Sequence, residues 1–212
     1  MMEKLVEHLE SLGYPVVHTR EPGGTTIGLQ IRKLLLDPET VGMGQLSEVF
    51  LFMADRAQHT IEVIVPALEA GKVVIQDRGY LSTLVYQCRV KGVPLNIITM
   101  LNSYAMAGVV PDLSIVFDVD AHTGLSRNRT AAKFDRFEAE SLTFREEVRR
   151  GYLHYAKEDP ERIRIINASH PPHIVFEQTR GIVESFLDAR GLYDSNCGGG
   201  ARGVRPDRYS GF

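Results

Sequence analysis

The fold is decided by the stretch Val16-Val17-His18-Thr19-Arg20-Glu21-Pro22-Gly23-Gly24-Thr25, in which a short strand leads into a loop. The first four residues are suited to a buried strand, whereas the proline and the two glycines are typical of loops. Apolar residues recur at helical spacing on both sides of this stretch, across 5–12 and across 27–35. The sequence therefore predicts a helix, a strand, a charged loop and a second helix in that order.

The same order of elements is repeated along the chain. Short apolar runs predict further strands at 73–75, 113–117 and 163–166. Helices are predicted at about 47–70, with Ser47 as N-cap and a bend at Pro66, and then at 80–90, at 94–107, from 121, from 142 and at 172–190. Short strands that alternate with helices are typical of an α/β domain with a parallel sheet covered on both faces.

The composition is that of an ordinary globular domain, since the 212 residues are 43% hydrophobic and 24% charged. The net charge of -3 provides no bulk attraction to nucleic acid or to an anionic membrane, so neither partner is expected. Cys88 and Cys197 lie far apart and predict a reduced, cytoplasmic protein rather than a disulfide framework. One domain is expected over 1–190, followed by a disordered tail over 191–212 that is rich in Gly and Arg.

Charged pairs follow the first two predicted strands directly. Arg20-Glu21 comes after the first strand and Asp77-Arg78 after the second. Ligands of open parallel sheets bind beyond the carboxyl ends of the strands, and the planar guanidinium of Arg suits a phosphate group. Two such pairs at equivalent strand ends predict an anion pocket.

Phe52 and Arg56 lie one helical turn apart on the predicted helix 47–70. An aromatic ring next to an Arg can bind a flat heterocycle, by stacking and by hydrogen bonds respectively. The plain alternative is a core Phe beside an exposed Arg, and this pair by itself does not decide between the two.

An ordered series of motifs over roughly 1–187 resembles the bacterial-type thymidylate kinase family. The matching stretches are Thr19–Thr25, Ile31-Arg32, Leu51–His59, Asp77-Arg78, Ser82–Gln87, Pro111–Leu113, Phe117–Val119, Phe134–Glu138, Gly151–Leu153 and Asp159–Arg162. The resemblance implies a P-loop kinase-type three-layer fold with a parallel sheet. It also implies transfer of a phosphoryl group from ATP to dTMP with Mg2+, and a homodimer formed through helices that include the one that binds thymine.

The family resemblance also assigns roles around the nucleoside. Phe52 would stack on thymine, and Arg56 would donate a hydrogen bond to an exocyclic oxygen of the base. Thr83 and Gln87 would lie beside the base, and Tyr86 against the deoxyribose. Val49, Phe50 and Met53 are apolar on the same helix and fit either the dimer or plain core burial.

A second group of residues is implied for the phosphates. Arg78 would hold the monophosphate, with support from Arg20 and Arg32, and Asp77 would act through magnesium-bound water, with no direct metal ligand. Cations of a lid at about 127–141 would meet the transferred phosphoryl group, although a solvated charged face is the plain alternative for the first two. These lid cations are Arg127, Arg129 and Arg136. The catalytic set implied in this way is Asp77, Arg78 and Arg136.

The sequence contains no Gly-x-x-x-x-Gly-Lys-Ser/Thr loop, which cradles ATP phosphates in this family. We therefore expect that the first, central strand and the phosphate-binding loop are missing, as in an N-terminally truncated chain. Two alternatives follow from this expectation: a catalytically impaired, dTMP-binding pseudokinase, or a fragmentary gene model. A third alternative is another nucleotide kinase on the same fold.

Overall fold

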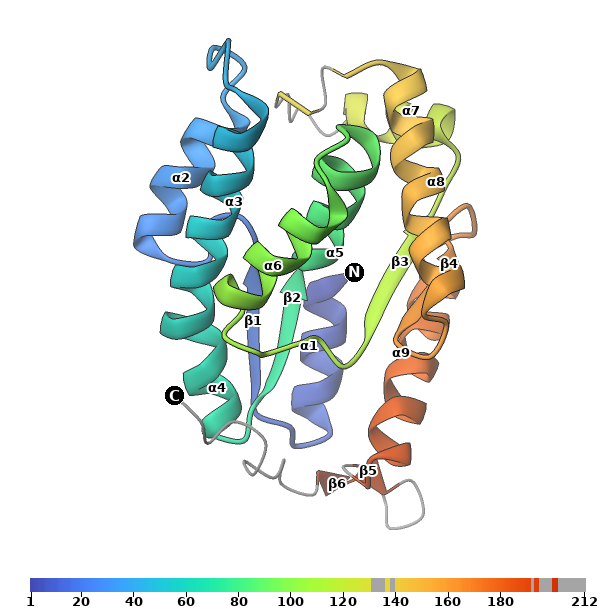
Figure 1. Cartoon of the computed structure of the whole chain (residues 1–212). Coiled ribbons are helices and arrows are strands. Elements are labelled where there is room, and N and C mark those ends of the chain that lie inside the picture. The colour runs from blue at the N-terminus through green and yellow to red at the C-terminus, as the bar shows by residue number, and fades with distance from the viewer. Residues whose placement is uncertain (131–135, 138–139, 192, 195–199, 202–212) are drawn as a thin grey trace.

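The computed structural model describes residues 1–130, 136–137, 140–191, 193–194 and 200–201 (Figure 1). Its strands follow helices in alternation, as the apolar pattern predicts. β1 (Val16–Arg20) pairs in parallel with β2 (Val73–Asp77), and β3 (Ser114–Asp118) pairs in parallel with β4 (Ile163–Asn167). Each predicted strand is therefore confirmed, with its carboxyl end one or two residues further along the chain.

The predicted parallel sheet is present in the described residues as two separate parallel pairs, β1-β2 and β3-β4. In the first pair Arg20 is the register partner of Asp77, so the two charged loops emerge side by side. This pairing does not confirm that a first, central strand is missing, and that expectation stays a prediction.

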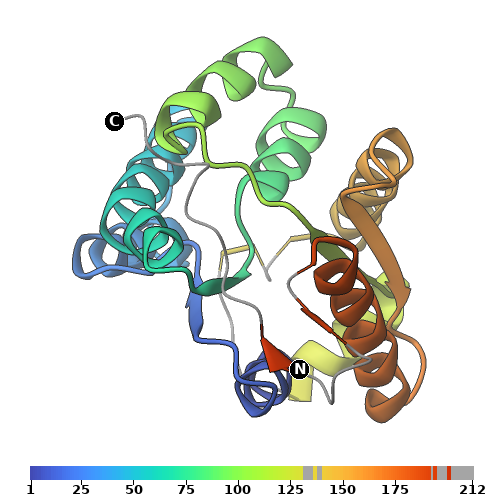
Figure 2. The same ribbon diagram turned by 90° about the horizontal axis from the view of Figure 1, so that it is seen from below.

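A core cluster connects the two pairs of strands. It is formed by Leu5 and Leu9 of α1 (Met2–Ser11) and by Val183 and Leu187 of α9 (Pro172–Ala189). Partly buried side chains of β2 and β3 pack against it, among them Ile75 and Ile115, which is consistent with the places of α1 and α9 below the strands in Figure 2. Burial of aliphatic side chains contributes about 1.5–3 kcal/mol each, so this cluster is a main source of the domain's stability.

α2 (Thr26–Leu36) and α3 (Gln45–His59) lie together on the side of β1 (Figure 1). The prediction that Ser47 caps α3 is wrong, because the helix begins at Gln45 with Gly44 as its N-cap residue. The chain then widens into a π-type turn, η1 (Thr60–Ile64), before α4 (Val65–Glu69). Pro66 lies in the first turn of α4, where its missing N–H is tolerated, and the predicted bend at this residue stays a prediction.

The remaining helices surround the carboxyl ends of the strands. α5 (Tyr80–Thr83) continues as a π-type segment, η2 (Leu84–Val90), and α6 (Leu95–Ala105) packs beside α3 around Val49 and Ile98. α7 (Ala121–Thr130) overlaps the start of the predicted lid, and α8 (Leu142–Glu158) follows the lid range with its N-cap on Ser141. In the tail, β5 (Tyr193–Asp194) pairs with β6 (Gly200–Ala201), and the predicted disorder otherwise concerns residues outside the described part. Among the described helices, none has the length and apolar character needed to cross a membrane.

Candidate active site

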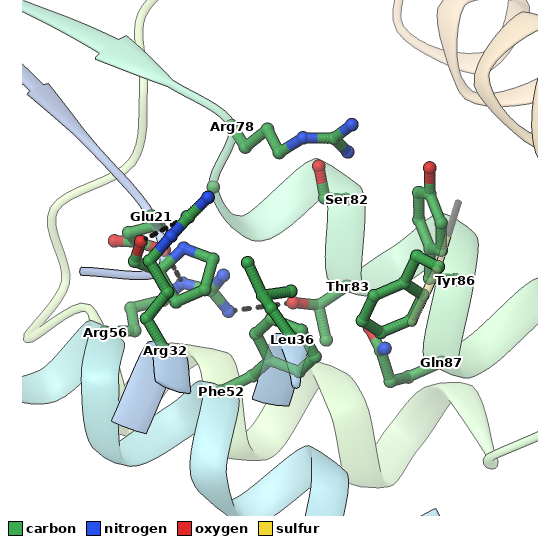
Figure 3. A pocket seen from close by; sticks show the side chains of 13 residues that line it. Glu21, Arg32, Leu36, Phe52, Arg56, Arg78, Ser82, Thr83, Tyr86 and Gln87 are labelled. Atoms are coloured by element: carbon green, nitrogen blue, oxygen red, sulfur yellow. Dashed lines mark hydrogen bonds and ion pairs between the residues drawn. The ribbon is translucent and has the colours of Figure 1, made fainter. Parts of the chain in front are cut away.

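A pocket opens at the carboxyl ends of β1 and β2, where the sequence places its charged pairs (Figure 3). Its walls come from the loop after β1, from α2, from α3 and from α5 with η2. Most of the predicted substrate residues line this pocket: Arg32, Phe52, Arg56, Arg78, Thr83, Tyr86 and Gln87. Arg20 is exposed and does not line the pocket. Its register partner Asp77 is the last residue of β2 and directly precedes Arg78, which does line the pocket.

Arg56 is buried at the inner end of the pocket, with only 3% of its surface exposed. Its Nε donates to Oε2 of Glu21 at 2.8 Å, and its Nη1 donates to Oδ1 of Asn102 at 2.6 Å and to Oγ1 of Thr83 at 3.1 Å. Phe52 on the preceding turn is half-buried and faces the pocket. The plain alternative of a core Phe beside an exposed Arg is therefore wrong for this pair.

Glu21 is the counter-charge of Arg56 and is itself 4% exposed. Burial by itself favours the neutral carboxyl, but the Arg56 guanidinium and the His59 ring outweigh it and hold the pKa of Glu21 below its ordinary value. The carboxylate is thus ionised at neutral pH. No individual role for Glu21 follows from the sequence, although its place between Arg20 and Pro22 in the charged loop was a signal.

Asp55 holds the same loop from α3. Its Oδ1 accepts from the backbone N of Gly23 at 2.8 Å, whereas its Oδ2 is buried with no hydrogen-bond partner among the described residues. Burial raises the pKa of Asp55 to about 6, against the effect of the Gly23 hydrogen bond. Two carboxyl groups therefore connect the loop after β1 to α3. The pKa of Glu21 lies below its ordinary value, and that of Asp55 lies above it.

Arg78 lies on the opposite side of the pocket, directly after β2. Its backbone has φ +64°, a left-handed conformation that is unfavourable for a residue with a side chain. The guanidinium carbon is 5.8 Å from the centre of the Tyr86 ring, and Tyr86 raises the pKa of Arg78. Strain of this kind persists where a side chain must point in one direction, here toward the pocket. Arg32 lines the same pocket, with its Nη1 donating to the carbonyl of Pro22 at 2.8 Å.

Aromatic side chains form the outer part of the pocket. Phe137 lies 6.2 Å from Phe52 and 5.7 Å from Tyr86 between ring centres, and the second pair meets edge to face. Flat heterocycles bind well against such rings. Phe137 lies within the predicted lid motif, and nothing in its local sequence indicated that it reaches Phe52 of α3.

The predicted lid cations Arg127 and Arg136 have different hydrogen-bond partners. Arg136 donates from Nη2 to Oε2 of Glu48 at 2.5 Å and from Nε to the carbonyl of Leu35 at 3.1 Å. Glu48 is 2% exposed and also accepts from Nε2 of Gln87 and from Lys91. Arg127 donates to the carbonyl of Ala168 at 2.8 Å, and the side chain of Arg129 lies outside the described part.

A second pocket adjoins the first and shares Arg78, Tyr86 and Phe137 with it. It extends to Asp118 at the end of β3, where Arg149 of α8 donates from Nε at 2.7 Å and from Nη2 at 3.0 Å. Within the described residues, no three His, Cys, Asp or Glu side chains lie close enough together to hold a metal ion.

The arrangement combines a buried Arg that can donate to a heterocycle, aromatic rings for its faces, and a second Arg for an anion. These are the chemical requirements of a site for a nucleoside monophosphate. The shared position of Arg78 between two pockets also places an anion bound there in reach of a second ligand.

Comparison with known proteins assigns a family to this arrangement. The family model described as thymidylate kinase matches residues 1–179. A thymidylate kinase of Desulfovibrio desulfuricans is 46% identical over 197 residues, which cover 90% of this chain and 91% of that protein. A thymidylate kinase of Solidesulfovibrio magneticus is 43% identical over 193 residues, covering 88% and 92% respectively. That of Symbiobacterium thermophilum is 42% identical over 186 residues, covering 88% and 86%. These matches do not bear out the expectation of a missing phosphate-binding loop.

Proposed function

Given that this chain belongs to the thymidylate kinase family, we propose that it transfers the γ-phosphoryl group of ATP to dTMP and forms dTDP for dTTP synthesis. It is then a nucleoside monophosphate kinase on a P-loop kinase-type fold. The single observation that carries the substrate assignment is the buried Arg56 at the inner end of an aromatic pocket that has Arg78 on its other side. The comparisons do not favour the dTMP-binding pseudokinase.

In the proposed complex the thymine ring lies against Phe52, and Arg56 donates to an exocyclic oxygen of the base. Thr83 and Gln87 line the wall beside the ring, and Tyr86 faces the deoxyribose. Support comes from the geometry, because all of these side chains line one pocket and Arg56 is held by buried partners. Buried polar groups of this kind discriminate strongly, since a wrong substrate leaves them without a partner.

The acceptor phosphate is proposed to bind Arg78, with Arg32 in the same pocket lining and Arg20 as a supporting cation outside that lining. Because Arg78 also lines the second pocket, the phosphates of ATP are proposed to approach from there. An acceptor phosphate oxygen is already ionised at neutral pH, so this transfer needs positioning and charge stabilisation rather than a general base.

Magnesium is the metal implied by this reaction. Asp77 is exposed at the end of β2, next to Arg78, and its carboxylate oxygens are of the hard type that Mg2+ prefers. Asp77 would hold the ion through a water molecule, and the ion would neutralise charge on the phosphates. Arg127, Arg129 and Arg136 stay proposed lid cations, and Arg136 has to exchange its Glu48 ion pair for the ligand.

A homodimer through α3 is also proposed. Val49 and Met53 are core residues, but Phe50 is 56% exposed and Leu46 is 51% exposed on the same helix. Large apolar side chains on one exposed helix are a basis for association. The molar mass from light scattering after size exclusion tests this proposal, and a Phe50→Glu variant should shift a dimer to monomer. The cytoplasmic location stays a prediction from the composition.

The activity is tested by following ADP formation from ATP with the purified chain, Mg2+ and either dTMP or no acceptor. We expect dTMP-dependent ADP and an equal amount of dTDP, and little turnover with dGMP or dCMP. Binding of dTMP without any dTDP would replace the kinase with the dTMP-binding module. Turnover that is faster with another monophosphate would assign a different nucleotide kinase.

A further inference from the structure

A chain of hydrogen bonds runs from Arg56 and Glu21 in the pocket lining to His59 and Thr19, which lie outside the lining. His59 of α3 is fully buried, and its Nδ1 is 3.0 Å from Oε1 of Glu21. Its Nε2 is 2.6 Å from Oγ1 of Thr19 in β1. The other carboxylate oxygen of Glu21 accepts from Nε of Arg56. Thr19, His59, Glu21 and Arg56 thus form a continuous series that ends in the pocket.

The chemistry of Glu21 defines the role of the ring. An ionised carboxylate only accepts hydrogen bonds, so Nδ1 of His59 carries the hydrogen in this contact. In a neutral ring Nε2 then accepts from the hydroxyl of Thr19. Each polar group of the series has a partner, which keeps the carboxylate of Glu21 in a single orientation.

The loop after β1 is packed directly against the His59 ring. A Cβ atom added to Gly24 would come within 2.4 Å of the ring carbon Cδ2 and within 2.6 Å of Nε2. The backbone at Gly24 is thus in close contact with the ring, and a side chain at this position would displace one of the two. His59 therefore holds both the carboxylate and the backbone of the segment that carries it.

This arrangement determines the direction of Arg56. The guanidinium is planar, and its Nε and Nη1 are bound to Glu21, Thr83 and Asn102. With Nε and Nη1 engaged by these residues, the guanidinium is held in one direction relative to the pocket that it lines (Figure 3). If Glu21 rotated, the guanidinium would lose the contact that orients it and would sample several directions.

We propose that His59 is a positioning residue for base selection, which acts by holding Glu21 so that Arg56 donates to the 4-oxo group of a pyrimidine. The proposal rests on the proposed function, in which Arg56 contacts the base. A pyrimidine with a 4-amino group presents a donor to the Arg56 donor and is rejected. Because the series is held by contacts over 38 and 40 residues of sequence, His59 affects recognition without touching the ligand.

The test compares dUMP with dCMP, which differ only at the C4 position and the ring nitrogen beside it. Calorimetric titration of the whole chain gives the dissociation constants of dTMP, dUMP and dCMP. We expect the wild type to prefer dUMP to dCMP by at least tenfold. His59→Leu, which removes both ring nitrogens, should weaken dUMP binding about 10- to 100-fold and change dCMP binding by less than about threefold.

Conservative variants separate positioning from folding. His59→Asn keeps an N–H donor near the place of Nδ1 and should recover part of the preference, and Glu21→Gln should lose it as His59→Leu does. Leu187→Ala, in the core between α1 and α9, should lower the melting temperature and keep the wild-type preference. If His59→Leu does not fold, Glu21→Gln and His59→Asn carry the comparison.

The outcomes are distinguishable. A folded His59→Leu or Glu21→Gln variant with an unchanged ratio of dUMP to dCMP affinity overturns the positioning role and leaves the proposed function intact. A wild type that binds dTMP but does not discriminate dUMP from dCMP also overturns it. A wild type that binds no dTMP overturns the proposed function together with this inference.

Discussion

Asp55 and Arg56 are neighbours in the chain, but their surroundings differ. Arg56 has charged and polar partners on Nε and Nη1, whereas one carboxyl oxygen of Asp55 is buried without a partner in the described part of the chain. A buried polar group without a partner costs about 1–3 kcal/mol, more if it is charged. Asp55 is therefore a residue whose ionisation opposes folding, beside one whose ionisation is satisfied.

The free energy of unfolding should depend on pH through Asp55. Its pKa is raised from 3.8 to about 6 in the folded protein, so the folded state binds a proton more tightly than the unfolded state. The resulting contribution to stability is present below about pH 4 and is lost as the pH rises through about 6. Asp55→Asn removes the charge, so we expect the variant to gain on the order of 1–3 kcal/mol relative to wild type between pH 4 and pH 7.5.

Urea unfolding of both proteins at pH 4.5 and pH 7.5 measures this gain. Asp188→Asn, at an exposed position near the end of α9, is the matched control and should show the same difference from wild type at both pH values. If Asp55→Asn changes the free energy of unfolding by the same amount at both pH values, the raised pKa of Asp55 is contradicted.

Arg78 should contribute to binding through the phosphate alone. Arg78→Met keeps much of the side-chain length and removes the charge, so dTMP should bind about 10- to 100-fold more weakly, since a hydrogen bond to a charged group contributes about 1.5–3 kcal/mol. Thymidine, which has no phosphate, should bind both proteins equally. Arg150→Met, at a 61% exposed side chain on α8, is the matched control. Equal losses for dTMP and thymidine would mean that Arg78 supports the pocket rather than the phosphate.

At the scale of elements, α8 packs closely against η2 at Gly151. A Cβ atom added to Gly151 would lie 2.8 Å from Cγ1 of Val85 in η2, closer than real Cβ contacts allow. A Cβ atom added to Gly181 of α9 would have no neighbouring atom within 4 Å among the atoms of the described residues. Both glycines thus lie within α-helices, but an added Cβ atom would clash at Gly151 and would meet open space at Gly181.

This pair predicts opposite effects of one substitution. Gly181→Ala should raise the free energy of unfolding by about 0.5–1 kcal/mol, because alanine loses less backbone freedom in a helix. Gly151→Ala should lower it by about 1–3 kcal/mol, because the helices must separate to accept the methyl group. Denaturant midpoints at constant m-value measure both changes. A stabilised Gly151→Ala variant would show that α8 can move away from η2 at little cost.

At the scale of the whole molecule, the pocket exists only when distant elements are assembled. Its residues come from the loop after β1, α2, α3, α5 and η2, with Phe137 from the segment before α8. An unfolded chain therefore has no dTMP site, so dTMP should bind only the folded state and stabilise it.

The expected stabilisation follows from mass action. At a free dTMP concentration of 100 times its dissociation constant, the free energy of unfolding should rise by about 2.7 kcal/mol. The melting temperature, measured against dTMP concentration, should rise without saturating above that constant. dGMP is the control, because its two-ring base is larger than the pyrimidine that Phe52 and Arg56 are proposed to hold. A melting temperature that does not respond to dTMP would contradict the proposed site.

Local pattern determined much of the protein. The strands, the alternation with helices and the charged strand ends at Arg20 and Asp77 follow from apolar spacing and from loop residues, which act over a few positions. The ordered motifs also identified the pocket residues Phe52, Arg56 and Arg78, since one turn of helix and one strand end are local geometry. The N-cap of α3 was misplaced, because Ser47 is a good capping residue but the helix begins earlier, after Gly44.

Only the tertiary structure decided how those residues are held. The oxygen partners of Arg56 lie 27 to 46 residues away along the chain, and His59 reaches Glu21 across 38 residues. Periodicity predicts which face of a helix is buried, but it does not predict which polar groups meet there. Which polar groups meet depends on how β1, α3, α5 and α6 pack, because a buried charge is stable only where the packing brings a hydrogen-bonding partner next to it. For the same physical reason, the roles of His59, Glu48 and Phe137 became visible only in three dimensions.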